Sequence, residues 1–299
     1  MSNQPLKGAD LKGCYTAIVT PFKNGAIDEP GFKKLIEFQI ENGVHGLVAV
    51  GTTGESPTLT YDEHKRVIQV CVETVKGRVP VIAGTGSNNT AEALELTKFA
   101  AQVGASASLN VCPYYNKPTQ DGIFDHFEYL ANECGIPIIL YNIPGRCSVN
   151  MTAKTILDLS EHENIIGIKE ASGSIDQVTQ ILLEAPKGFA VLAGDDTFTA
   201  PIMAIGASGV ISTVSNVAPR MMADLCNAAL EGNFRKAGQM QVQMFQLIQA
   251  MFCESNPVPA KTALSLMGFI SNEIRMPLHV LSQEHTEQVR QALSSLKIL

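Results

Sequence analysis

The sequence lacks a long apolar run: no stretch approaches 18 uncharged apolar residues, so it contains no candidate for a membrane-spanning helix. It also lacks a run of lysine and arginine, and 22 basic against 29 acidic side chains leave a net charge of −7. Proteins that follow phosphate backbones or anionic lipid usually carry a basic patch. We therefore expect neither nucleic acid nor membrane as a partner. The first residues lack both an apolar signal core and an Arg/Ser-rich transit pattern, so we expect a cytoplasmic protein.

Cysteine and histidine are present without the spacing that a metal site or a disulfide framework requires. The seven cysteines form an odd set with no CxxC pair, and the six histidines include no HxH or HExxH motif. We expect most cysteines to be small apolar core residues and expect no bound metal.

The composition indicates a globular protein with a full core. Apolar residues make up 45% of the 299 positions and charged residues 17%, which is too apolar for a disordered chain. This length allows one large domain or two ordinary ones. Short β-branched runs alternate with longer amphipathic segments at intervals close to the ~30 residues of a strand–helix unit. Eight runs are found, starting near Cys14, Gly46, Val79, Ser108, Pro137, Ile165, Ala190 and Gly209.

Eight such units favour the α/β class and a closed (β/α)8 TIM barrel over an open sheet. The continuous apolar character of the runs predicts strands buried on both faces. Thr60 and Glu63 form a capping box before a helix ending near Val75, Thr152 precedes another helix, and Pro219 opens the eighth. We predict a barrel domain over residues 1–232 and a C-terminal helical domain over 233–299, with helices over 233–253, 258–267 and 284–296.

Active sites of TIM barrels lie at the carboxyl ends of the strands, so polar residues at those positions are the candidates for this protein's site. Four segments are prominent: 51–56 (GTTGES), 113–118 (PYYNKP), 141–146 (YNIPGR) and 167–173 (GIKEASG). In segment 51–56, flanking glycines let the backbone approach a ligand closely, and hydroxyl and amide groups there can donate hydrogen bonds to a carboxylate.

Lys169 is the most informative residue, because a lysine in an apolar interior strand loses hydration and its pKa falls toward that of an amine that attacks carbonyls. Tyr141 sits at the same level on the neighbouring strand and could transfer a proton. The alternatives are a lysine that pairs with Glu170 or faces the helices, and an ordinary buried tyrosine.

Two weaker motifs have structural explanations. Residues 84–88 (GTGSN) imitate part of a dinucleotide-binding fingerprint but lack its third glycine, and a tight turn explains them. Residues 194–197 (GDDT) could bind a cation, but an aspartate at a helix N-cap is the preferred interpretation.

Together with NPVPAK at 256–261, the four prominent segments resemble the dihydrodipicolinate synthases, in order along nearly the whole chain. GTTGE and YNIP are shared with the wider pyruvate-lysine aldolase superfamily, which includes N-acetylneuraminate lyases and 2-keto-3-deoxy-sugar-acid aldolases. PYYNKP and the Gly-Arg after YNIP are more discriminating.

The resemblance implies condensation of pyruvate with L-aspartate 4-semialdehyde on the route to lysine and diaminopimelate. It implies that Lys169 forms an imine with pyruvate, which makes a metal or organic cofactor unnecessary. The matching family positions assign Tyr141, Thr52 and Tyr115 to a proton relay, with Tyr115 entering the neighbouring subunit's site in a homotetramer that is a dimer of dimers. Substrate-binding positions are Thr52, Thr53, Arg146, Gly194 and Ile211, with Arg146 on the semialdehyde's carboxylate.

Two alternatives stay open at this point. A sialic-acid or sugar-acid aldolase would need hydroxyl-binding groups where Arg146 stands, so Arg146 and Tyr115 favour the synthase. A non-catalytic keto-acid-binding scaffold would not need the complete relay. The resemblance also suggests inhibition by L-lysine through Ser56, Tyr61, His64, Asn88, Glu92 and Tyr114, although Tyr61 and Pro57 depart from the histidine and small residue common there.

Overall fold

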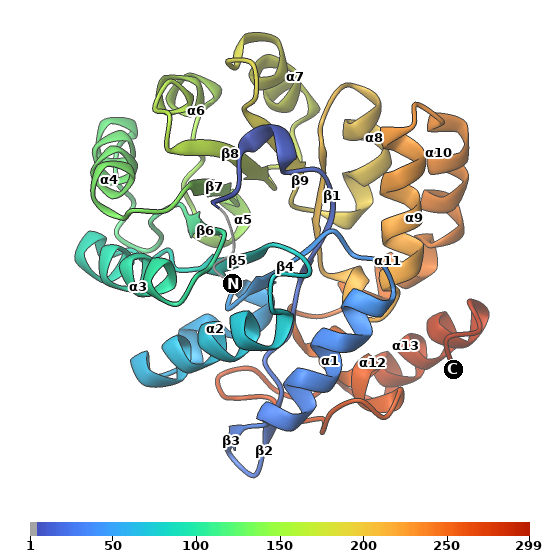
Figure 1. Cartoon of the computed structure of the whole chain (residues 1–299). Helices are drawn as coiled ribbons and strands as arrows, with labels where there is room; N and C mark the ends of the chain where they lie inside the picture. The colour runs from blue at the N-terminus through green and yellow to red at the C-terminus, as the bar shows by residue number, and fades with distance from the viewer. Residues whose placement is uncertain (1–4) are drawn as a thin grey trace.

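Eight parallel strands close into a barrel in the computed structural model, which describes residues 5–299. Their order is β1-β10-β9-β8-β7-β6-β5-β4, and β1 pairs with both β10 and β4. The predicted (β/α)8 fold is therefore confirmed (Figure 1). The strands are β1 Gly13–Ala17, β4 Gly46–Ala49, β5 Val81–Gly84, β6 Ala107–Val111, β7 Ile138–Asn142, β8 Ile165–Glu170, β9 Ala190–Ala193 and β10 Gly209–Ser212.

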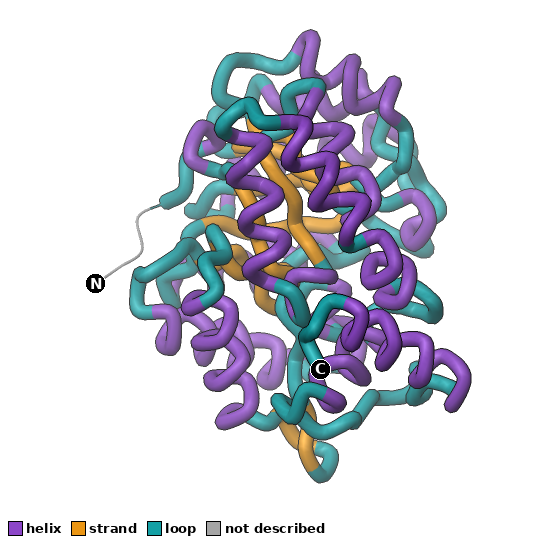
Figure 2. The backbone as a smooth tube through the Cα atoms, turned by 90° about the vertical axis from the view of Figure 1, so that its right-hand side faces the viewer, coloured by secondary structure: helices purple, strands orange, loops and turns teal. Residues whose placement is uncertain are grey.

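Helices surround the strands, as Figure 2 shows from the side. Thr60 caps α2 as predicted: its hydroxyl accepts from the Glu63 N–H at 3.2 Å, and the Glu63 carboxylate accepts from the Thr60 N–H at 2.9 Å. Thr152 caps α6 and Pro219 is the first residue of α9, also as predicted. The barrel helices are α1 Glu29–Glu41, α2 Tyr61–Val75, α3 Thr90–Gln102, α4 Gln120–Glu133, α6 Ala153–Ser160, α7 Ile175–Glu184, α8 Thr199–Ala204 and α9 Pro219–Leu230.

The strands are buried on both faces, because alternate side chains point in opposite directions. Those pointing outward join the helices in the larger apolar cluster, whereas those pointing inward form a smaller cluster inside the barrel. In β7, for example, Leu140 belongs to the outer cluster, and Ile139 and Tyr141 belong to the inner one.

The C-terminal region is helical, but one predicted helix is wrong. The segment 233–253 forms two helices, α10 Phe234–Gln243 and α11 Phe245–Met251, which divide at the fully buried Met244. The two helices pack differently: α10 lies against α8 and α9, whereas α11 lies chiefly against the C-terminal helix α13 (Gln283–Ser295) and also contacts the turns that follow β9 and β10. The remaining helices, α12 Val258–Leu266 and α13 Gln283–Ser295, are close to the predicted bounds. The division into domains at residue 232 stays a prediction.

A small hairpin precedes α1 and was not predicted. Strands β2 Phe22–Lys23 and β3 Ala26–Ile27 are joined by Asn24 and Gly25, both with positive φ. Asn-Gly is a strong hairpin motif, so the sequence contained the information that identifies this turn. The N–H groups of both turn residues donate to the Glu273 carboxylate, at 2.8 and 2.7 Å, which joins the hairpin to the C-terminal region.

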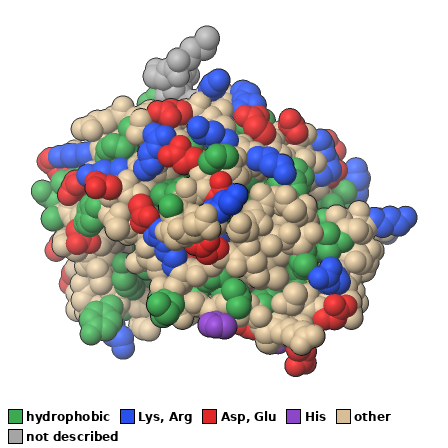
Figure 3. All heavy atoms as spheres, turned by 90° about the horizontal axis from the view of Figure 1, so that it is seen from below, with side chains coloured by type: hydrophobic (Ala, Val, Ile, Leu, Met, Phe, Trp, Pro, Cys, Tyr) green, Lys and Arg blue, Asp and Glu red, His purple; other side chains and the backbone are tan. Residues whose placement is uncertain are grey.

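Within residues 5–299, no helix has both the length and the apolar character needed to cross a membrane. Basic and acidic side chains are interspersed on the face seen in Figure 3. That face therefore carries no broad patch of one charge.

Candidate active site

Lys169 lies at the carboxyl end of β8 and points into the barrel. It pairs in register with Tyr141 of β7, an inner-cluster residue, and its Nζ lies 4.3 Å from the centre of the tyrosine ring. Glu170 faces the other way, where its carboxylate accepts from Asn142, Ser172 and Gln177. The alternative in which Lys169 pairs with Glu170 or faces the helices is therefore excluded.

The surroundings of Lys169 favour the neutral amine. Lys169 is only 6% exposed, and its burial, with a smaller contribution from Arg146, lowers its pKa to about 8 against the opposing effects of Asp196 and Asp195. An amine with this pKa is partly unprotonated near neutral pH, and the unprotonated form is the one that attacks a carbonyl.

Tyr141 and Thr52 lie at the same end of the barrel. Tyr141 is 5% exposed, and burial raises the pKa of its phenol to about 12, although the neighbouring Thr52 side chain acts in the opposite direction. Thr52 begins the turn Thr52–Gly54 directly after β4. Thr52 lies 89 positions before Tyr141 and 117 before Lys169 in the chain, so it is the closure of the barrel that brings the three residues together.

The other expected substrate-binding residues surround the same end. Thr53 is buried and its hydroxyl lies 3.4 Å from that of Thr213, which follows β10. Ile211 of β10 belongs to the inner cluster. Gly194 follows β9, and a Cβ there would lie 2.6 Å from that of Ala171, so only glycine fits. Arg146 is exposed on the short helix Pro144–Cys147 that follows β7.

Tyr115 differs from these residues because its side chain is 89% exposed, on a backbone with φ of 72°. A side chain this exposed makes little contact with its own chain. The structure of one chain therefore does not bring Tyr115 into the group formed by Lys169, Tyr141 and Thr52.

A cavity of about 180 Å³ lies beside the turn after β4. Five of the six residues expected to bind lysine line it, and the exception is Asn88, whose carbonyl accepts from Asn116. His64 Nε2 lies 2.8 Å from the Gly84 carbonyl, so this nitrogen carries the proton, and burial lowers the pKa of the ring. The lining includes Ser56, Tyr61, His64, Glu92 and Tyr114.

Both weaker motifs have structural roles, but residues 84–88 pack closely against neighbouring backbone and do not form the tight turn that was expected. Cβ atoms at Gly84 and Gly86 would each lie 2.3 Å from neighbouring backbone, so these glycines permit close packing of the loop. Asp195 caps a short helical turn by accepting from the Thr197 N–H at 2.8 Å. Asp196 was not predicted to matter, but it is buried and accepts from Ser212 and Thr213, and burial raises its pKa to about 6.

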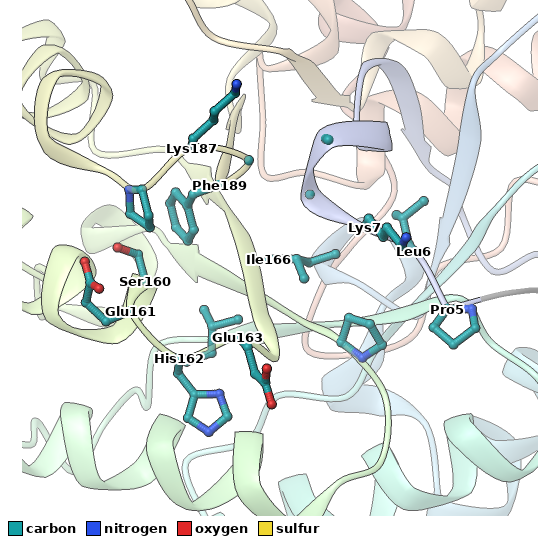
Figure 4. Close-up of a pocket in the computed structure, with 16 residues that line it drawn as sticks. Pro5, Leu6, Lys7, Ser160, Glu161, His162, Glu163, Ile166, Lys187 and Phe189 are labelled. Atoms are coloured by element: carbon teal, nitrogen blue, oxygen red, sulfur yellow. The ribbon is translucent and has the colours of Figure 1, made fainter.

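A larger hollow lies elsewhere in the molecule. A pocket of about 800 Å³ is lined by residues that precede strands, including Gly8, Pro137 and Phe189 (Figure 4). It therefore lies at the amino ends of the strands, opposite to Lys169, and is not the candidate active site. Among residues 5–299, no group of three or more His, Cys, Asp or Glu side chains is arranged to hold a metal ion.

Asn256 is a second residue near this site that was not predicted from the sequence. Its side chain donates to the Thr53 hydroxyl at 2.9 Å, and its carbonyl accepts from the Arg146 guanidinium at 3.2 Å. The NPVPAK segment supported the resemblance, but nothing in its spacing placed it beside Thr53 and Arg146, which lie 203 and 110 positions earlier.

The barrel and its buried lysine–tyrosine pair define a lyase of the class I aldolase type. The chain belongs to the dihydrodipicolinate synthetase (DHDPS) family, whose model matches residues 10–296.

Its relatives agree with this assignment. The chain is 51% identical to a 4-hydroxy-tetrahydrodipicolinate synthase of Syntrophus aciditrophicus, over 97% of this chain and 99% of the relative. A dihydrodipicolinate synthase from Acinetobacter baumannii complexed with pyruvate is 42% identical, with a TM-score of 0.95 over 97% of this chain and 100% of that one. DHDPS from Cyanidioschyzon merolae with lysine bound is 39% identical, with a TM-score of 0.94 over 97% and 99%.

Proposed function

We propose that the chain acts as a 4-hydroxy-tetrahydrodipicolinate synthase, which condenses pyruvate with L-aspartate 4-semialdehyde. The observation that carries this proposal is Lys169, a buried lysine with a lowered pKa beside Tyr141 at the carboxyl end of the barrel. The test is to incubate the protein with pyruvate, reduce it with borohydride and locate the adduct by mass spectrometry, then to add the semialdehyde and follow product formation. A scaffold that only binds keto acids would give no adduct.

The proposed reaction begins when the Lys169 amine attacks the pyruvate ketone and water leaves, giving an imine. Loss of a methyl proton produces an enamine, and its carbon attacks the aldehyde of the second substrate. The amino group of that substrate then attacks the imine carbon, which closes the ring and releases Lys169. The protonated imine is the electron sink of this sequence.

Each remaining residue has one proposed task. Thr52 and Thr53 hold the pyruvate carboxylate, near Gly194 and Ile211, while Tyr141 transfers protons to and from the reacting atoms. The Thr52 side chain is near enough to Tyr141 to lower the pKa of its phenol, and this nearness supports a relay.

Arg146 is proposed to bind the carboxylate of the semialdehyde, because its planar guanidinium can donate two parallel hydrogen bonds. We expect Arg146→Ala to raise the KM for the semialdehyde roughly 10- to 150-fold, as a lost charge-assisted hydrogen bond costs about 1.5–3 kcal/mol. Steady-state kinetics with each substrate varied in turn measures this. Arg146→Lys keeps the positive charge but cannot donate two parallel hydrogen bonds, so its KM for the semialdehyde should lie between those of the parent and Arg146→Ala. An equal rise in both KM values would contradict the assignment.

Tyr115 is proposed to complete the relay in a neighbouring subunit of a homotetramer, which its exposure supports. We expect Tyr115→Phe to be weakly active and mixtures with inactive Lys169→Ala chains to regain activity. In a mixed dimer, the site that keeps Lys169 receives an intact Tyr115 from its partner. Activity is measured after subunits are unfolded and refolded together, with each variant refolded alone as the control. Mixtures no more active than Tyr115→Phe alone would show that Tyr115 acts within its own subunit.

L-Lysine is proposed as an inhibitor that binds the 180 Å³ cavity. The Glu92 carboxylate, which accepts from Ser87 at 2.9 Å, could pair with an ammonium group, while the unprotonated Nδ1 of His64 could accept a hydrogen bond. Tyr114 lines the cavity and adjoins Tyr115, so an ordered Tyr114 would restrain the relay tyrosine.

We therefore expect L-lysine to lower the rate at saturating pyruvate, with Glu92→Thr much less sensitive. Initial rates against added L-lysine measure the effect. About millimolar L-lysine is enough to detect even a weak affinity for a small ligand. If the parent protein is not inhibited at that concentration, or if Glu92→Thr is inhibited equally, this site is excluded.

A further inference from the structure

Asn256 contacts two residues that are proposed to bind different substrates. It lies between α11 and α12 with 9% of its surface exposed. Its side-chain Nδ2 donates to Thr53 Oγ1, whereas its main-chain carbonyl accepts from Arg146. One residue of the C-terminal region thus contacts both the pyruvate-carboxylate threonine and the semialdehyde arginine.

The direction of the hydrogen bond to Thr53 determines what the threonine can do. An amide N–H₂ group only donates, so Thr53 Oγ1 must accept and its single O–H is left to donate elsewhere. A carboxylate only accepts, and therefore needs a donating hydroxyl opposite it. Thr213 Oγ1, at 3.4 Å, is a weak competitor for that proton. Asn256 thus leaves Thr53 in the state that a carboxylate requires.

The amide of Asn256 is not arranged for stability alone. Of the buried side-chain nitrogen and oxygen atoms in residues 5–299, only Asn256 Oδ1 and His126 Nε2 have no hydrogen-bond partner. An unpartnered buried acceptor destabilises a fold, and such groups are rare in native proteins. A side chain that keeps one while donating to an active-site threonine is better explained by function than by packing.

The segment that carries Asn256 is held firmly beside the active site. Lys261 of α12 forms a fully buried ion pair with Glu55, at 2.5 Å, and Glu55 follows directly after the turn that contains Thr53. The Lys261 N–H donates to the Pro257 carbonyl, which links the ion pair to the residue after Asn256. Thr53 and Asn256 are therefore fixed to one another from two sides.

We propose that Asn256 is a positioning residue for both substrates of the proposed reaction. Its side-chain amide orients the Thr53 hydroxyl toward the pyruvate carboxylate, and its main-chain carbonyl holds the Arg146 guanidinium in place. This proposal rests on the proposed function, and it predicts that changes to the side chain affect pyruvate alone, because Arg146 is held by the main chain.

The test compares Asn256→Ala, Asn256→Asp and the control Asn272→Ala. Asn272 is an exposed asparagine of the same region whose side chain accepts a hydrogen bond from Thr262 of α12, so the control also removes one asparagine hydrogen bond, but not one to Thr53 or Arg146. Pyruvate is titrated in the borohydride-trapping assay, and both KM values are measured. We expect Asn256→Ala to raise the half-saturating pyruvate concentration about tenfold, the size of one lost hydrogen bond, and to leave the KM for the semialdehyde near that of the parent. We expect Asn272→Ala to match the parent.

Asn256→Asp separates positioning from packing. Aspartate has the same shape, but its carboxylate would accept the Thr53 proton and repel the pyruvate carboxylate, so we expect it to raise the pyruvate concentration more than alanine does. A purely structural role predicts the reverse order, and thermal denaturation of each variant identifies any that is poorly folded.

The possible failures can be told apart. A parent protein that forms no adduct with pyruvate overturns the proposed function and this proposal with it. If the parent does form the adduct, three results overturn only the role of Asn256. They are an unchanged half-saturating pyruvate concentration in Asn256→Ala, a smaller rise of that concentration in Asn256→Asp than in Asn256→Ala, and equal rises in the two KM values.

Discussion

Lys169→Ala is expected to abolish borohydride trapping and to lower turnover by about 10⁴-fold or more, the scale seen when a covalent nucleophile is removed. The reason is that no other amine lies on the inner face beside Tyr141 in the paired strands β7 and β8. Mass spectrometry of the reduced protein and steady-state kinetics measure the two effects. Lys169→Arg is the matched control for folding, because arginine fills the strand position but stays protonated and cannot attack pyruvate.

The pH dependence of trapping tests the same residue independently. Burial lowers the pKa of Lys169 to about 8, so the fraction of free amine rises as the pH increases through that value. We expect the trapping rate of the parent to rise with the fraction of free amine and to level off at pH values above about 8. Substantial turnover by Lys169→Ala with pyruvate would reject the imine mechanism, and a rate that does not change around pH 8 would reject the role of desolvation.

Lys261→Met is expected to give the largest loss of stability. The Lys261–Glu55 pair has 0% and 1% of its side-chain surfaces exposed. Removing the lysine therefore leaves a buried carboxylate without its charged partner, with only the main-chain N–H of Arg275 still donating to it, at 3.2 Å. Such a change costs about 3–5 kcal/mol, and each kcal/mol lowers the Tm by roughly 2–4 °C in a domain of about this size. Thermal denaturation at fixed pH measures the shift.

The chain contains a matched control for this prediction. Lys154 and Asp158 form a pair with the same N–O distance of 2.5 Å, but their side chains are 82% and 48% exposed. Solvent screens such a pair, so Lys154→Met should change stability by less than about 1 kcal/mol. The double variant Lys261→Met with Glu55→Gln should recover part of the loss, since the amide carries no charge. Equal shifts for the two lysine variants would contradict the importance of burial.

Much of the fold could be predicted because its determinants are local. The spacing of the apolar residues, the capping residues and the turn residues indicate each strand and each helix within about ten positions of the chain. All eight predicted strands are found, and the capping box at Thr60 and Glu63 begins α2 as expected. The carboxyl-end rule for barrels then limited the candidate site to a few segments, which is why Lys169 and Tyr141 could be selected without a structure.

Tertiary structure decided what local patterns leave open. The sequence contains adjacent charged residues, Lys169 and Glu170, and only the pairing of β8 with β7 shows which one enters the barrel. Likewise, the helical spacing of apolar residues continues through Met244 and predicts one helix. The structure has two helices, α10 and α11, which pack against different elements. In each case, the neighbours that decide the outcome come from other elements.

By itself, the sequence determined the fold class, the family resemblance and the lysine on which the proposed chemistry rests. Only the tertiary structure brought Asn256 to Thr53 and Lys261 to Glu55, across separations of 203 and 206 residues. Contacts of this kind leave no periodicity in the chain, because the ordering of all the intervening elements brings the two ends together. Local patterns therefore specify where strands and helices begin, whereas the partners of a buried polar group are settled only when the barrel closes and the C-terminal helices pack against it.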